Sequence, residues 1–375
     1  MWLAASQFPP PERRTARRFA VAVAIPARNE AARITACLAA LDAAAARAQG
    51  WVDTLTVLVV ANNCSDATAT CAMAYRPRHY RLRVKAITLA PADAHAGGAR
   101  RQALALARAG LLPDDVLMTS DADSCVDPGW IAANLHEIAS GADVVAGTIT
   151  LSPGERATLP PLPGRDLEWR LAEIAAEIED HLDPVAHDRW PRHIWAWGAS
   201  LALTVAAHDR IGGVPAIPLA EDRALAEAVL RHDLRLRHSP YPLVYTSARL
   251  IGRAPGGFAD LVKGFAENAG QPCDAALEPV ADLVRRLRWR RRLRHAWDRD
   301  GAAAALTLNG RPWAEAMPAC FGSLWHWLEQ RSPSLRRRRL LPADLPGEVA
   351  MATTLLDRFR AAETNPCDNP AAARA

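Results

Sequence analysis

The sequence lacks a long apolar run, a CxxC cysteine pair and a strong charge of one sign, and each absence excludes a class of protein. No stretch of about 18 consecutive apolar residues occurs, so no transmembrane helix is predicted. The seven cysteines are scattered along the chain, which favours free thiols over a disulfide framework or a zinc site. The net charge is only +4, and no nucleic-acid partner is expected.

The N-terminal stretch and the first apolar run lack two further signals. The first 18 residues are rich in Pro and Arg and have no apolar stretch of the secretory kind. With the free thiols, this predicts a cytoplasmic protein, and peripheral contact at the inner membrane surface stays open. Neither GxGxxG nor GxxxxGK[ST] follows the first apolar run, whereas a dehydrogenase, a P-loop NTPase or a nucleotidyltransferase would need glycines there to bring amides to phosphate.

Short apolar runs alternate with helical patterns through the first 150 residues. The strands predicted from these runs are 19–27, 54–61, 83–89 and 114–120. The runs are too short for helices, and the segments between them have helical spacing. This alternation predicts an α/β fold with a mostly parallel central sheet that helices cover on both faces. In such sheets ligands bind beyond the carboxyl ends of the strands.

Polar side chains follow three of the predicted strands, so we expect them to meet at one edge of the sheet. They are Arg28, Asn29 and Glu30 after the first strand, Asn62 and Asn63 after the second, and Asp121 and Asp123 after the fourth. The last two form a DxD triplet whose hard oxygen ligands suit Mg²⁺ or Mn²⁺ together with a substrate phosphate. An Asx-type turn before Pro128 is the alternative.

Three other stretches carry candidate residues with plainer alternatives. Glu221 and Asp222 stand at the start of a predicted helix, where acids either stabilise the helix dipole or provide a general base. Arg100 lies at a glycine-rich helix start and could pair with a nucleotide or simply be an exposed charge. Trp195 and Trp197 could stack on a sugar or belong to the core.

Five stretches in this order resemble the family 2 glycosyltransferases, which are inverting enzymes with the nucleotide-diphospho-sugar transferase (A-type) fold. The matching residues are Pro26, Asn29 and Glu30; the segment 61–68; Asp121 and Asp123; Gly198, Ala199 and Ser200; and Glu221 and Asp222. The sequence departs from the family pattern at Ala61 and Asn62, which replace an acidic pair. The QxxRW motif of processive synthases is absent, which favours a single transfer.

The resemblance implies a metal-dependent glycosyltransferase that moves a sugar, most simply a hexose, from a UDP- or GDP-sugar to a hydroxyl acceptor that the sequence does not identify. The implied nucleotide-sugar ligands are Pro26, Arg28, Glu30, Asn62, Arg100 and Asp121. The implied metal ligands are Asp123 and Asp121, with Mg²⁺ or Mn²⁺. Asp222, with Glu221 beside it, is the implied catalytic base, and the implied acceptor side is Trp197, Gly198, Ala199 and Ser200.

Changes in composition, together with the extent of the resemblance at about 19–260, suggest the division of the chain. We expect a flexible arm at 1–18, the catalytic domain at 19–265, an Arg- and Trp-rich helical extension at 276–362 and a disordered tail at 363–375. The arginines of 285–297 could bind an anionic membrane surface, or they could pair with acids of the protein. A retaining glycosyltransferase of similar fold and a non-catalytic scaffold protein are the other interpretations of the whole chain.

Overall fold

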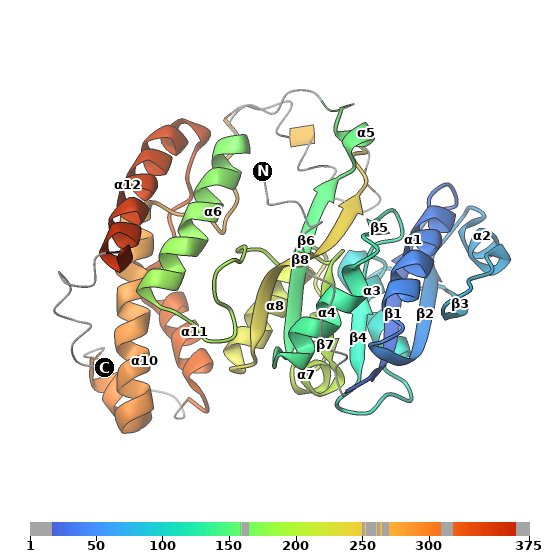
Figure 1. Ribbon diagram of the computed structural model, residues 1–375, viewed down its shortest axis with the longest axis horizontal. Helices are drawn as coiled ribbons and strands as arrows, with labels where there is room; N and C mark the ends of the chain where they lie inside the picture. Colours follow the sequence, from blue (N-terminus) through green and yellow to red (C-terminus); the bar gives the residue numbers. More distant parts are fainter. Residues whose placement is uncertain are drawn as a thin grey trace. The chain divides into compact units, whose positions relative to one another are not determined.

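The computed structural model describes residues 17–157, 159, 165–249, 252, 260, 263–264, 270–308 and 318–364. All but the last two residues of the predicted arm, and all but the first two of the predicted tail, lie outside these ranges. The chain divides into two compact units, residues 1–160 with 195–264 and residues 161–194 with 265–375 (Figure 1). The division into 19–265 and 276–362 stays a prediction; in the contacts, the segment 161–194 belongs with the C-terminal helices.

The first unit contains a sheet of eight described strands in the order β3-β2-β1-β4-β7-β6-β8-β5. Their bounds are β1 Phe19–Ala27, β2 Val52–Asn62, β3 Arg81–Ile87, β4 Val116–Thr119, β5 Cys125–Val126, β6 Val144–Leu151, β7 Leu201–Thr204 and β8 Leu236–Thr246. β1 to β4 pair in parallel, β7 is antiparallel to both β4 and β6, and β8 is parallel to β6. Because the two reversals cancel, β6 and β8 run in the same direction as β1, and the predicted mostly parallel sheet is confirmed.

Helices cover both faces of this sheet, as the alternation of strands and helices predicts. The helices of this unit are α1 Ile34–Arg47, α2 Thr68–Ala74, α3 Ala96–Ala107, α4 Trp130–Ala139, α5 Pro153–Arg156, α7 Val205–Arg210 and α8 Glu221–Arg231. Alternate residues of β1 point to opposite faces. Val21 and Val23 pack in one core cluster with residues of α1 and α4, whereas Ala22 and Ala24 pack in another with residues of α3 and α8.

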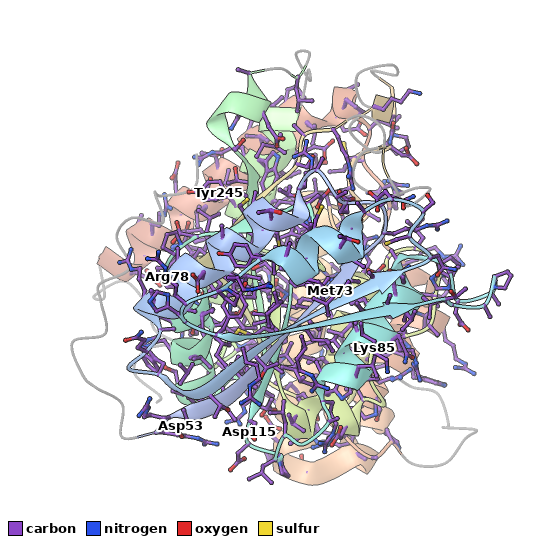
Figure 2. All side chains as sticks on the ribbon, turned by 90° about the vertical axis from the view of Figure 1, so that its right-hand side faces the viewer. Asp53, Met73, Arg78, Lys85, Asp115 and Tyr245 are labelled. Carbon is purple, nitrogen blue, oxygen red and sulfur yellow. The ribbon has the colours of Figure 1, made fainter. Side chains whose placement is uncertain are left out.

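The two edges of the sheet can be told apart in Figure 2. Asp53 and Asp115 lie at the amino ends of β2 and β4, and Tyr245 lies near the carboxyl end of β8, on the other side of the view. The residues that follow β1, β2, β4 and β8 therefore share the carboxyl edge. Because β7 is reversed, the residues that precede it lie at this edge too.

The second unit is helical, as the predicted C-terminal extension requires. Its helices are α6 Arg165–Leu182, α10 Val280–Leu308, α11 Phe321–Arg331 and α12 Leu345–Thr364, with short 3₁₀ turns η2 Pro333–Leu335 and η3 Pro342–Asp344. α6 packs on α12, where His181 stacks on Phe359 and Arg360 pairs with Glu177. No helix of the described ranges is both long and apolar enough to cross a bilayer.

Candidate active site

The loop after β1 is bound by hydrogen bonds to the loop after β2. The side-chain oxygen of Asn29 accepts the Ser65 amide at 2.8 Å. The hydroxyl of Thr68 accepts the Glu30 amide at 2.7 Å, and the carboxylate of Asp66 accepts the Ala31 amide at 3.1 Å. Asn29 has φ 56°, in the left-handed region that Asn tolerates better than most residues. These contacts hold two of the predicted motifs together as one wall.

Asn62, the last residue of β2, brings an unused hydrogen-bond acceptor to this wall. Its side chain is buried, with 2% exposure, and its Oδ1 has no hydrogen-bond partner among the described residues. A buried acceptor without a donor costs free energy, and such groups are rare in native structures. A ligand that presents an N–H group there would remove this cost. The predicted nucleotide contact at Asn62 fits this arrangement.

Arg100 connects the DxD triplet to the start of α8. Its buried guanidinium donates to Asp121 Oδ1 at 2.8 Å and to Glu221 Oε1 at 3.1 Å. It also donates to the Gly198 carbonyl at 2.7 Å and to the Thr119 hydroxyl at 3.1 Å. Burial opposes the charge of Arg100, but Asp121 and Glu221 outweigh burial and raise its pKa. Arg100 is therefore a fixed cation inside the site.

Arg249 is the second cation of the site, and it bridges two acids that the sequence assigns to nucleotide and metal. Its guanidinium lies 2.7 Å from Glu30 Oε1 and 2.8 Å from Asp123 Oδ2. Burial, followed by the charges of Asp121 and Glu30, raises the pKa of Asp123 to about 6, although Arg249 acts in the opposite direction. The site therefore carries more negative charge than its arginines neutralise.

The start of α8 places Asp222 at the same edge. Ala220 adopts φ 59°, which costs about 1–2 kcal/mol for a residue with a Cβ atom, and the helix begins at the next residue. The Asp222 carboxylate accepts the Gly198 amide at 2.9 Å and the Arg223 amide at 2.8 Å. Burial, followed by the charge of Glu221, raises the pKa of Asp222, against the two amides and Arg100.

Gly198 lies between Arg100 and Asp222, where a side chain does not fit. A Cβ atom there would lie 2.4 Å from Arg100 Nη2. Since the Gly198 carbonyl accepts from Arg100 and its amide donates to Asp222, its backbone couples the two groups. The close approach of Arg100 therefore explains why the predicted acceptor-side motif has a glycine at position 198.

The remaining predicted residues differ in their surroundings. Trp197 stacks on Trp195, with ring centroids 5.2 Å apart, and both are half-buried. Ala199 and Ser200 are buried, and the Ser200 hydroxyl accepts from the Trp130 indole at 3.0 Å, so this side chain serves the core. Pro26 is half-buried within β1, and Arg28 is exposed and donates to the Ala94 carbonyl at 3.2 Å. Their binding roles stay predictions.

The donor set of the DxD triplet fits a divalent cation in charge and in atom type. Asp121 and Asp123 provide hard oxygen ligands, and Arg249 now lies 2.8 Å from Asp123, where a cation would compete with it. No cluster of three His, Cys, Asp or Glu side chains in the described part of the chain is arranged to hold a metal by itself. A cation here would therefore need oxygens from a ligand or from water, which is typical of Mg²⁺ sites.

The sequence interpretation missed Arg249. The signal was present, because Arg249 follows β8, and residues that follow parallel strands were the ones singled out. β8 was not predicted as a strand, and the reversal at β7 that aligns it with β1 has no local sequence signature. The role of Thr68 was missed as well, because its hydroxyl accepts the amide of Glu30, which lies in the loop after another strand.

Comparison with known proteins gives one family match. The family model described as glycosyl transferase family 2 matches residues 22–192. This range contains the motifs at 26–30, 61–68 and 121–123, whereas those at 198–200 and 221–222 lie beyond it. No curated protein matches the chain.

The solved structures with distant likeness to the chain include the following three. One is the mannosyltransferase PcManGT from Pyrobaculum calidifontis in complex with GDP-Man and Mn²⁺, at 16% identity and TM-score 0.46 over 92% of this chain and 81% of that one. TarS 1–349 of S. aureus has 15% identity and TM-score 0.41 over 75% and 74% of the two chains. The glucosyl-3-phosphoglycerate synthase of M. tuberculosis has 15% identity and TM-score 0.40 over 66% and 79%.

Proposed function

We propose, from the premise that residues 22–192 belong to glycosyl transferase family 2, that the chain moves a sugar from a nucleoside-diphosphate sugar to an acceptor hydroxyl, with inversion and in single transfers. The match to this family indicates that the chain is a glycosyltransferase. The observation that carries the finer proposal is the excess of carboxylates at the carboxyl edge. The acids are Glu30, Asp121, Asp123, Glu221 and Asp222. Arg100 and Arg249 pair with the first four, and Asp222 accepts two backbone amides.

Two carboxylates of this edge have different roles in the proposed reaction. Asp222 accepts the proton of the acceptor hydroxyl while that oxygen forms a bond to the anomeric carbon and the bond to the nucleoside diphosphate breaks. Its raised pKa improves it as a base, and the amides of Gly198 and Arg223 fix its direction. Asp123, with Asp121, would hold Mg²⁺ or Mn²⁺, which supplies positive charge to the departing diphosphate when bound.

The proposal is tested first on the donor, through Asn62. We expect Asn62→Leu to weaken binding of a nucleoside diphosphate by about three- to tenfold, the value of one hydrogen bond, without lowering the stability of the free protein. Stability is retained because the lost Oδ1 atom has no partner in the described structure. Isothermal titration with UDP and GDP, alongside thermal unfolding without ligand, measures both quantities.

Asn134 provides a matched control for this experiment. It is also buried with an unpartnered Oδ1 atom, but it lies on α4 and donates to the Trp130 carbonyl. Asn134→Leu should leave nucleotide affinity unchanged. Equal affinities in Asn62→Leu and the wild type would exclude Asn62 from the nucleotide site.

The metal is tested through Arg249, whose guanidinium is paired with the proposed metal ligand Asp123. We expect Arg249→Ala to bind Mn²⁺ more tightly in the absence of nucleotide, by on the order of tenfold, or about 1.4 kcal/mol, because a competing guanidinium is removed. Titration of Mn²⁺ by electron paramagnetic resonance at pH 8 measures this affinity while Asp123, with its pKa near 6, is ionised.

Arg249→Lys is the control, since it keeps the charge without the two-pronged bridge. Its Mn²⁺ affinity should lie between those of the wild type and Arg249→Ala. Weaker Mn²⁺ binding by Arg249→Ala than by the wild type would contradict the assignment of Asp123 as a metal ligand.

The anomeric configuration of the product, read by nuclear magnetic resonance, separates inversion from the retaining alternative.

A further inference from the structure

Apart from Arg285, which pairs with Asp282, the arginines of α10 fall into two sets with different surroundings. Three of them, four residues apart, face acids within the same unit. Arg286 donates to Glu278 at 2.8 Å, Arg290 lies 2.6 Å from Glu179, and Arg294 lies 2.7 Å from Asp183. Glu179 and Asp183 belong to α6. This set is explained by folding, because it neutralises acids that would otherwise be buried without a partner.

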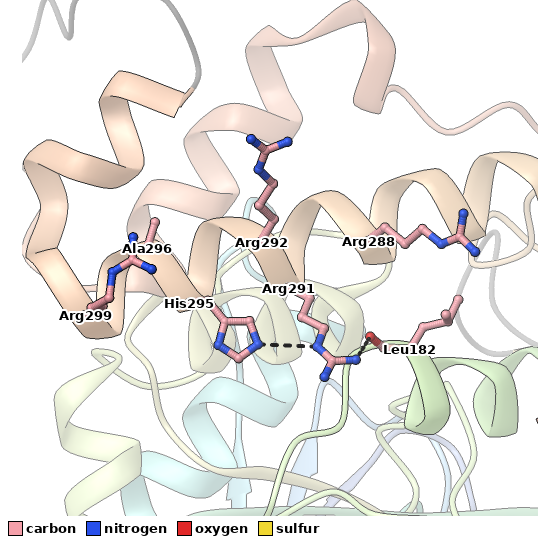
Figure 3. A pocket seen from close by; sticks show the side chains of 7 residues that line it. All are labelled: Leu182, Arg288, Arg291, Arg292, His295, Ala296 and Arg299. Atoms are coloured by element: carbon pink, nitrogen blue, oxygen red, sulfur yellow. Dashed lines mark hydrogen bonds between the residues drawn. The ribbon is translucent and has the colours of Figure 1, made fainter. Parts of the chain in front are cut away.

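The second set lines an open groove of about 540 Å³ on the same helix (Figure 3). The lining residues are Leu182, Arg288, Arg291, Arg292, His295, Ala296 and Arg299. The four arginines and the histidine are exposed. Successive members are three or four residues apart, except that Arg291 and Arg292 are adjacent in sequence, so most of them are neighbours on the helix surface.

Of the four groove arginines, Arg299 alone has an ion pair among the described residues, with the neighbouring Asp300 at 2.7 Å. Arg291 donates to the Leu182 carbonyl at 3.2 Å and to His295 at 3.4 Å, and Arg292 lies over the ring of Trp289. No ion pair joins Arg288, Arg291 or Arg292 to a carboxylate in the described ranges. Like charges at this spacing cost about 0.2–0.5 kcal/mol per pair. The contacts of Arg291 and Arg292 leave their positive charges without a carboxylate partner, so an anionic ligand explains the clustering better than folding does.

We propose that this groove binds a soluble ligand that carries two or more phosphate groups. Several guanidinium groups near one another fit phosphate oxygens, which they bind through paired N–H donors. A membrane surface fits less well, because a helix that binds in the interface also presents large apolar side chains. The exposed large apolar side chains of the described residues lie elsewhere in the chain, and residues 280–302 of α10 contribute none. The proposal needs no step of the transferase reaction.

The test measures binding of inorganic tripolyphosphate by isothermal titration, with a chelator present so that no metal site takes part. The wild type should bind, and more weakly at high salt. The double variant Arg288→Gln with Arg291→Gln should lose at least tenfold in affinity, equivalent to about 1.4 kcal/mol. Its thermal midpoint should change little, since both side chains are exposed and the removal of like charges offsets the lost hydrogen bond from Arg291 to the Leu182 carbonyl.

Arg358→Gln is the matched control, an exposed arginine of α12 in the same unit. Its affinity for tripolyphosphate should equal that of the wild type. Equal losses in the two variants, or no binding by the wild type, would overturn the proposal. Co-sedimentation with vesicles of phosphatidylcholine and phosphatidylserine forms the second arm. Binding to these vesicles without binding to tripolyphosphate would overturn it in favour of a membrane surface.

Discussion

Asp222→Asn is expected to lower kcat by about 10²–10⁴-fold, the range that a positioned general base contributes, while the affinity for the nucleotide sugar stays near that of the wild type. Asparagine keeps the size of the side chain, and its oxygen can still accept one of the two amides that hold Asp222. It cannot take a proton from the acceptor. Single-turnover transfer and donor titration measure the two quantities separately.

The pH profile of the wild type adds a second readout. Asp222 accepts a proton only when ionised, so kcat should fall as the pH falls through its pKa. Because burial and Glu221 raise this pKa, the fall should begin at a higher pH than for an ordinary aspartate. Asp53→Asn, at the amino end of β2, is the control and should change neither kcat nor the affinity for the nucleotide sugar. Normal turnover by Asp222→Asn would show that the base is another group.

Arg100→Met is expected to destabilise the first unit by about 3–5 kcal/mol, because removal of one partner of a buried ion pair leaves the other charge uncompensated. Glu221 is buried, and Arg100 is its ion-pair partner at 3.1 Å. Thr119 and the Gly198 carbonyl lose a donor at the same time. Urea denaturation followed by tryptophan fluorescence measures the change in the free energy of unfolding.

The neighbouring arginine is the control for this variant. Arg101 is exposed and donates to the Val214 carbonyl, so Arg101→Met should cost only about 1 kcal/mol. Adding Glu221→Gln to Arg100→Met should recover part of the loss, since the buried charge disappears. A loss in Arg100→Met no larger than in Arg101→Met would show that the guanidinium does not hold the site together.

The sequence predicted those features that depend on residues close together in the chain. The strands at 19–27 and 114–120 were found from apolar runs that are too short for helices, and the structure has β1 and β4 there. The family resemblance rests on motifs that each span a few residues, and the family match confirms it. Predictions of this kind need only local patterns and the rule that parallel strands share an edge.

Contacts between distant segments could not be predicted in the same way. Arg100 and Glu221 are separated by 121 residues, and their pairing depends on the reversal of β7. The sequence offered Arg100 as a nucleotide ligand or an exposed charge; the second alternative is wrong because Arg100 is buried, and its role toward a nucleotide stays a prediction. Arg249 shows the same limit, because a single arginine after an unassigned strand has no pattern that marks it.

The bonds between the loops after β1 and β2 have a consequence for the thermodynamics of donor binding. Asn29, Glu30 and Ala31 are already fixed by Ser65, Thr68 and Asp66 in the free protein. The conformational entropy of these segments is therefore lost when the chain folds and not when a donor arrives. We therefore expect a donor to bind with little rearrangement of this wall. Little of the binding free energy should be lost to ordering these two loops.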